Sequence, residues 1–212
     1  EIAMDDKWKV GRVIARPYIG TKEGHFTRTS NRHDYALAPF SKTALDSLKD
    51  AGLDVIGVGK IPDIFVDQGI TRKIKTVSNE DGMNKTIELA SDNFNGLAFI
   101  NLVDFDAVYG HRRNAAGYGK AIEEFDVQLG ELINELKNDD LLMVTADHGN
   151  DPTYRGTDHT REQVPLIIYS KQFNEMKVLN DGDSFGIIGS TICDNFNVKY
   201  NGIGSSILEL LK

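Results

Sequence analysis

Five side chains in two short segments carry the donor atoms that divalent metal ions prefer. They are Asp106, His111, Asp147, His148 and His159. The first two lie within residues 101–111 and the other three within residues 145–159. Carboxylate oxygens and imidazole nitrogens suit Mn²⁺, Zn²⁺ or Mg²⁺ bound beside a phosphate. The pattern therefore predicts a site for two divalent ions, and no side chain nearby has an obvious claim to be a nucleophile.

Each of these signals is weak when it is taken alone. An Asp with a His five residues later arises by chance, and His111 could cap a helix, His148 could make core hydrogen bonds and His159 could be solvated. An Asp-His pair followed by Gly149 is more specific, because glycine lets the backbone turn sharply after the two ligands. Taken jointly, the residues favour metal binding.

The elements that must position these side chains alternate between strands and helices. Strands are predicted at residues 54–59, 97–103, 141–145 and 164–169, and helices at 41–52, with Ser41 as N-cap, 79–90, 118–136, 186–196 and 205–211. Strands that are separated by helices imply crossover connections, so the fold class is α/β with a mainly parallel sheet sandwiched by helices. The candidate ligands follow two strands directly, where such sheets collect ligands.

The overall charge argues against a nucleic-acid-binding protein. The 212 residues carry a formal net charge of −8, whereas phosphate backbones are bound through clustered Lys and Arg. Four arginines run against this acidic background near the start of the chain. They are Arg12, Arg16, Arg28 and Arg32. They could hold one small phosphorylated ligand through charge-assisted bonds, or they could be ordinary solvated surface residues.

Cysteine content and hydropathy indicate in which cellular environment the protein is expected to fold. Cys193 is the only cysteine, so no intrachain disulfide can form, and a reducing cytoplasm fits best. No stretch approaches the roughly 20 apolar residues of a membrane span, and no export signal is visible. A soluble cytoplasmic protein that contacts neither membrane nor nucleic acid is expected.

Other polar residues near the five candidates leave two interpretations open. Three carboxylates could orient the histidines, or they could be loop residues without a role at the site. They are Asp104, Asp151 and Asp158. Arg112 and Arg113 could contact a phosphate near the metal ions, or they could simply flank His111.

The motifs resemble those of a known enzyme family. Asp-x₄-His, then Asp-His-Gly, then a later His is similar to the carboxy-terminal half of the alkaline phosphatase superfamily. Within that superfamily the resemblance is to the phosphopentomutases, and it covers essentially the whole chain. The segments that carry it are 11–17, 26–29, 31–35, 101–113, 145–152 and 156–162.

The resemblance implies a ligand set for two Mn²⁺ ions. Asp106, His111 and His159 match the ligands of one ion, and Asp147 and His148 match ligands of the other. The family also uses an Asp from an amino-terminal strand and a phosphorylated Thr, and neither has an identifiable counterpart here. The nucleophilic Thr is therefore expected outside this chain, and the ligand types would also accept Zn²⁺ or Mg²⁺.

The resemblance also implies a division of the chain. Residues 1–36 would be the carboxy-terminal part of an inserted cap domain, and residues 37–212 the carboxy-terminal part of an incomplete alkaline-phosphatase-like core. Arg12, and Arg28 or Arg32, would then hold the sugar phosphate from the cap.

The implied reaction interconverts α-D-ribose 1-phosphate and D-ribose 5-phosphate, and the 2-deoxyribose pair, through a phosphothreonine enzyme and a bisphosphate intermediate. The implied partners are pentose phosphates and a missing amino-terminal segment of the same enzyme, without which the 212-residue chain should be inactive. Two alternatives remain: a cofactor-independent phosphoglycerate mutase or phosphatase of the same superfamily, and an inert metal-binding fragment.

Overall fold

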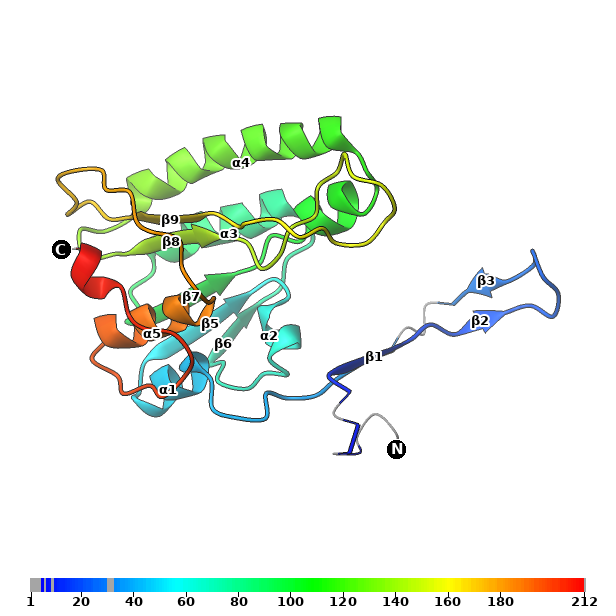
Figure 1. The fold of residues 1–212 in the computed structure, drawn as a ribbon, viewed down its shortest axis with the longest axis horizontal. Helices are drawn as coiled ribbons and strands as arrows, with labels where there is room; N and C mark the ends of the chain where they lie inside the picture. The colour runs from blue at the N-terminus through cyan, green and yellow to red at the C-terminus, as the bar shows by residue number, and fades with distance from the viewer. Residues whose placement is uncertain (1–4, 6, 9, 30–32, 212) are drawn as a thin grey trace.

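The computed structural model describes residues 5, 7–8, 10–29 and 33–211, except the side chains of residues 28, 33 and 34. Helices and strands alternate through most of the chain after residue 43 (Figure 1). The elements are α1 (Ala44–Asp50), β5 (Asp54–Val58), α2 (Ile61–Ile64), β6 (Arg72–Ile74), α3 (Asn79–Ser91), β7 (Gly96–Ile100), η2 (Phe105–Gly110), α4 (Ala115–Glu135), β8 (Leu142–Thr145), β9 (Leu166–Tyr169), α5 (Gly186–Asn195) and η3 (Leu208–Leu211).

A three-stranded parallel sheet with the order β6-β5-β7 lies at the centre of this arrangement. Val58, the last residue of β5, is in register with Ile74 at the end of β6 and with Ile100 at the end of β7. The carboxyl ends of the three strands therefore meet at one edge of the sheet. The predicted α/β class, with a parallel sheet between helices, is confirmed.

Strand β5 is buried on both faces, which explains its continuous apolar sequence. Val55 packs with Leu48 of α1 and Cys193 of α5 on one face. Ile56 and Val58 lie in a second cluster that contains Leu89 of α3. Each fully buried aliphatic side chain contributes about 1.5–3 kcal/mol to stability. These contacts therefore hold α1 and α5 on one face of β5 and α3 on the other. Burial also raises the pKa of the Cys193 thiol.

Strands β8 and β9 form a separate two-stranded sheet that is antiparallel. They are the exception to the predicted parallel arrangement. The physical reason is their connection: residues 146–165 contain no helix that could carry the chain back to the start of a parallel strand. Pro165 precedes β9, which pairs only with β8 in the described part of the chain, as an edge strand does.

A narrow arm precedes the α/β body and projects away from it (Figure 1). It consists of β1 (Arg12–Ala15) paired with β4 (His33–Ala36), and of β2 (Tyr18–Ile19) paired with β3 (Thr27–Arg28). Both pairs are antiparallel. The division at residue 36 between cap and core stays a prediction, although the arm differs in architecture from the body.

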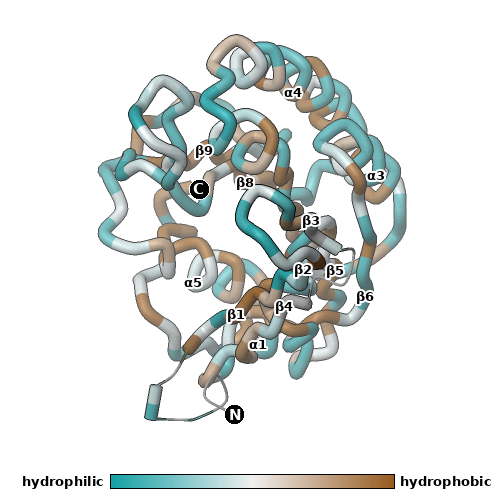
Figure 2. The backbone as a smooth tube through the Cα atoms, turned by 90° about the vertical axis from the view of Figure 1, so that its right-hand side faces the viewer, coloured by the Kyte–Doolittle hydropathy of each residue, from teal (hydrophilic) through white to brown (hydrophobic). Residues whose placement is uncertain are grey.

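The longer helices agree with the apolar periodicity of the sequence, whereas the helix predicted at 205–211 is only the 3-10 turn η3. Helix α4 is the longest, and hydrophilic and hydrophobic segments alternate along its tube (Figure 2), as one expects for a helix with one solvated face. It packs beside α3, where Gln128 Nε2 donates to Asn84 Oδ1 at 3.0 Å. Within the described residues, no helix is both long enough and apolar enough to cross a membrane.

The start of the first helix corrects a sequence prediction. The N-cap of α1 is Thr43, not Ser41. Thr43 and Asp46 form a capping box, in which the Asp46 amide donates to Thr43 Oγ1 and the Asp46 carboxylate accepts from the Thr43 amide at 2.7 Å. The reciprocal pair satisfies two amides that the helix leaves without partners. Ser41 lacks this acidic partner three residues later.

We expect Thr43→Ala to lower the free energy of unfolding by about 1 kcal/mol, because it removes the side-chain half of the capping box. Urea denaturation followed by circular dichroism measures the change. Ser41→Ala is the matched control, since Ser41 is exposed and outside the cap. Equal effects of the two substitutions would contradict the assignment of the cap.

Candidate metal centre

The first part of the candidate site follows β7 in a single π-helical turn, η2 (Phe105–Gly110). The wide turn brings Asp106 and His111 to the same side, where the His111 amide donates to the Asp106 carbonyl at 2.9 Å. Their side chains meet as well, with His111 Nε2 3.4 Å from Asp106 Oδ2. Such single π turns occur often at functional sites.

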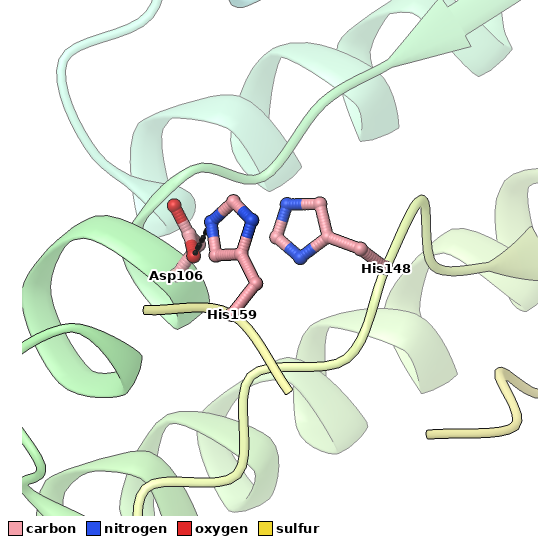
Figure 3. A group of neighbouring side chains, drawn as sticks. All are labelled: Asp106, His148 and His159. Atoms are coloured by element: carbon pink, nitrogen blue, oxygen red, sulfur yellow. Dashed lines mark ion pairs between the residues drawn. The ribbon is translucent and has the colours of Figure 1, made fainter. Parts of the chain in front are cut away.

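The second part of the site is the loop that connects β8 to β9. An antiparallel bridge joins Gly149 to Thr160, with the Thr160 amide donating to the Gly149 carbonyl at 3.1 Å. This bridge closes the loop and places His148 beside His159. Their rings stack with centroids 3.7 Å apart, and both side chains point toward Asp106 (Figure 3).

The two parts meet at the Asp106 carboxylate. His159 Nε2 lies 3.2 Å from Asp106 Oδ1, and one ligand atom each from Asp106, His148 and His159 lies within 4.8 Å of the others. One oxygen and two nitrogen donors in this space fit a divalent transition metal ion. His111 stacks on His159 with ring centroids 4.8 Å apart, so it belongs to the same cluster.

Asp147 stands at the outer side of the cluster. Its carboxylate is 70% exposed and lies 3.5 Å from His148 Nε2. Four of the five sequence-predicted ligands share one cluster: Asp106 contacts His111 and His159, and His148 stacks on His159. The contact of Asp147 is to its sequence neighbour His148.

Backbone carbonyls orient two of the imidazole rings. His111 Nδ1 lies 2.5 Å from the Thr157 carbonyl, and His148 Nδ1 lies 3.2 Å from the Gly149 carbonyl. A carbonyl only accepts, so each of these contacts is a hydrogen bond that a protonated Nδ1 donates. This arrangement is common for histidines that bind metal ions.

Asn150, which was not assigned a role from the sequence, contacts the cluster together with Arg113, for which a phosphate contact was one possibility. Asn150 is only 8% exposed, and its Nδ2 donates to Asp106 Oδ1 at 2.7 Å. Arg113 Nη1 in turn donates to Asn150 Oδ1 at 2.6 Å. The one signal in the sequence was the position of Asn150 directly after Asp-His-Gly, and it does not say which ligand the amide contacts.

The nearby carboxylates do not orient the histidines in the described part of the chain. Asp104 accepts from the Asn79 amide at 2.7 Å and so holds the start of α3. The Asp151 carboxylate accepts from the Thr153 hydroxyl and amide, and these hydrogen bonds lower its pKa. Asp158 contributes only its carbonyl, to Arg113. All three act as loop or capping residues.

The Asp106 carboxylate lies close enough to Tyr118, a half-buried residue of α4, to affect the pKa of its hydroxyl. Burial, followed by the nearby Asp106 carboxylate, raises the pKa of the Tyr118 hydroxyl. The Tyr118 ring also packs against Phe105, with centroids 5.6 Å apart. The start of α4 therefore covers one side of η2 with an uncharged aromatic surface.

The predicted phosphate-binding arginines lie outside the loops that carry the cluster. Arg12 is an exposed residue of β1, and the backbone of Arg28 is in β3, both within the projecting arm. Arg32 falls outside the described residues. Their role in binding a sugar phosphate stays a prediction.

We expect Gly110→Ala to destabilise the protein by about 1–3 kcal/mol. A methyl group at Gly110 would lie 2.6 Å from Asn150 Nδ2, so the amide would have to move away from Asp106. Gly119→Ala is the matched control, because nothing lies within 4 Å of a methyl group there. Urea denaturation of both variants measures the change in the free energy of unfolding. An unchanged free energy of unfolding in Gly110→Ala would contradict the close approach of Gly110 to Asn150.

Comparison with known proteins places the chain in a family. It is similar to the phosphopentomutases of Clostridium botulinum and Agathobacter rectalis, each 58% identical over 213 residues, and of Clostridium beijerinckii, 56% identical. These alignments cover 100% of this chain and 54% of each relative, so the chain spans about half the length of the curated relatives it matches. The Metalloenzyme superfamily model matches residues 15–200, and the chain therefore belongs to the Metalloenzyme superfamily.

Proposed function

We propose that the protein containing this chain is a phosphopentomutase, which interconverts α-D-ribose 1-phosphate and D-ribose 5-phosphate and the 2-deoxyribose pair. The observation that carries the proposal is the convergence of Asp106, His148 and His159 ligand atoms within 4.8 Å. Identity of 55–58% with phosphopentomutases over the whole chain supports it. A cation site next to the substrate stabilises the negative charge of a phosphoryl group during its transfer.

The resemblance to the phosphopentomutases implies an assignment of the ligands to two Mn²⁺ ions. Asp106 contacts His111 and His159, and these three would hold the first ion. Asp147 and His148, which are adjacent in sequence, would hold the second, and the His148 ligand atom also lies within 4.8 Å of those of Asp106 and His159. The stacking of His148 on His159 places the two groups next to each other. Paired metal sites of phosphoryl-transfer enzymes have this adjacency.

The residues of this chain would orient the reacting phosphoryl group rather than attack it. When bound, the metal ions supply positive charge that neutralises phosphoryl oxygens and lowers the pKa of a coordinated hydroxyl. The carbonyl contacts of His111 and His148 are made by Nδ1, so Nε2 is the ring atom of each that would bind a metal ion. We expect the nucleophilic threonine and one further aspartate ligand from a part of the protein outside this chain.

Several exposed surfaces support packing against that further part. Several large apolar side chains are highly exposed to solvent. They include Met176 and Val178, each 94% exposed, and Ile203, which is 79% exposed. Among the described residues, β7 pairs only with β5 and β8 only with β9, so each strand has one edge without a partner strand. Apolar patches and free edges are features of interfaces.

The substrate prediction concerns the full-length protein. We expect it to form ribose 5-phosphate from ribose 1-phosphate and not to isomerise 3-phosphoglycerate, in a coupled assay. Chelation should abolish activity and Mn²⁺ should restore it, with two ions per chain by elemental analysis. His148→Ala should lower kcat/KM at least roughly 100-fold, because loss of a ligand costs more than the 10- to 100-fold of its supporting residues.

His25→Ala provides the control for metal content. This exposed histidine lies on the arm, outside the cluster, so its removal should leave the two ions bound. Turnover of 3-phosphoglycerate in preference to ribose 1-phosphate would instead indicate a phosphoglycerate mutase. Full activity of the chelated enzyme would rule out the two-metal proposal.

The isolated 212-residue chain should have no mutase activity, because the nucleophile and one ligand are expected elsewhere. Ribose 1-phosphate turnover by the purified chain, with intact mass checked by mass spectrometry, tests this. We expect the full-length protein to be active under the same conditions. Robust turnover by the isolated chain would show that the nucleophile is among these 212 residues.

A further inference from the structure

We propose that Arg113 is a positioning residue of the metal centre, which acts through Asn150 on Asp106. The inference rests on the proposed function, since it concerns the same metal ligands. Arg113 follows His111 by two residues, and a phosphate-binding role was one alternative from the sequence. The contacts of its guanidinium favour a different role.

The guanidinium of Arg113 is bound by the loop between β8 and β9 on three sides. Nε donates to the Gly156 carbonyl at 2.5 Å, and Nη2 donates to the Asp158 carbonyl at 2.6 Å. Nη1 donates to the carbonyls of Asp151 at 2.8 Å and Gly110 at 3.1 Å, besides Asn150 Oδ1. Because most N–H groups of Arg113 are used within the protein, little capacity remains for a phosphate.

Four of these acceptors lie between the candidate ligands His148 and His159, and the fifth lies on the turn that carries Asp106. The Asp158 carbonyl directly precedes His159, and the Gly110 carbonyl directly precedes His111. A single rigid planar group therefore fixes the distance between the two segments of the site. Lysine could not do this, because its ammonium is a point charge without a fork of donors.

Arg113 also selects the orientation of the Asn150 amide. Guanidinium nitrogens only donate, so the amide oxygen of Asn150 must face Arg113 and its nitrogen must face away. The nitrogen then donates to Asp106 Oδ1. The opposite orientation would set donor against donor at Arg113 and acceptor against acceptor at Asp106. Arg113 thereby holds the carboxylate in the orientation in which Oδ1 and Oδ2 face His159 and His111.

The backbone of Arg113 ends the η2 turn. Its φ of 51° lies in the left-handed region, which costs a non-glycine residue of order 1–3 kcal/mol. The Arg113 and Asn114 amides donate to the Gly110 and Tyr109 carbonyls, each at 3.0 Å, as is common where a helical turn ends. The hydrogen bonds of the guanidinium help to offset the cost of this conformation.

The experiment measures metal binding rather than turnover, using the full-length protein freed of metal. We expect Arg113→Leu and Asn150→Ala each to weaken Mn²⁺ binding roughly 10- to 100-fold, as for other residues that support metal ligands. The double variant should be no weaker than the more affected single variant, because both act through one contact. Calorimetric titration gives the affinities, and visible absorption of the Co²⁺-loaded proteins reports the ligand geometry.

Arg155→Leu is the matched control, because Arg155 is an exposed arginine of the same loop and its removal changes the charge equally. Its Mn²⁺ affinity and Co²⁺ spectrum should stay at the wild-type values. Arg113→Lys keeps the positive charge but not the planar set of donors, so its Mn²⁺ affinity should lie between those of Arg113→Leu and the wild-type protein. This variant also tests the proposal if Arg113→Leu does not fold. Thermal unfolding of each metal-free variant separates loss of folding from loss of orientation.

The outcomes distinguish this inference from the proposed function. Absence of Mn²⁺ binding by the wild-type protein would overturn both. Wild-type binding with unchanged affinity and Co²⁺ spectrum in Arg113→Lys and Asn150→Ala would overturn only the role of Arg113. Additive losses in the double variant would show that Arg113 does not act through Asn150.

Discussion

The hydrogen bond from Asn150 Nδ2 to Asp106 Oδ1 joins segments that are 44 residues apart in the chain. Asp106 lies on the turn after β7, and Asn150 lies on the loop after β8, which belongs to a different sheet. No backbone pairing connects these two strands among the described residues. The mutual position of the candidate ligands therefore depends on side-chain contacts, with Arg113 and Asn150 as the main links.

These links are strong because their surroundings are partly dry. Asn150 is nearly buried, and a buried amide that loses a partner costs about 1–3 kcal/mol. Arg113 also binds the carbonyls of Gly156 and Asp158 and so connects two exposed turns of the loop to the cluster. The same groups that order the loop also orient the ligands, so stability of the loop and affinity for metal ions are expected to change together.

Local patterns were sufficient to predict most of the α/β body. The apolar run of β5 and the three- and four-residue spacing of α4 each depend on burial, which leaves a direct trace in residue type. The N-cap of α1 was misplaced because a serine and a threonine lie two residues apart, and only the Asp46 partner distinguishes them. The antiparallel pairing of β8 and β9 depends on the absence of a helix in a long loop, which residue types signal weakly.

The sequence by itself determined the five candidate ligands, since donor type and placement after strands are local properties. Tertiary structure decided how they meet: the Gly149–Thr160 bridge brings His159 beside His148, and the π turn sets His111 next to Asp106. It also decided that Arg113 binds the loop, whereas the sequence allowed a phosphate contact as well. Such roles depend on which acceptors distant segments present to a side chain, and residue order alone does not contain that information.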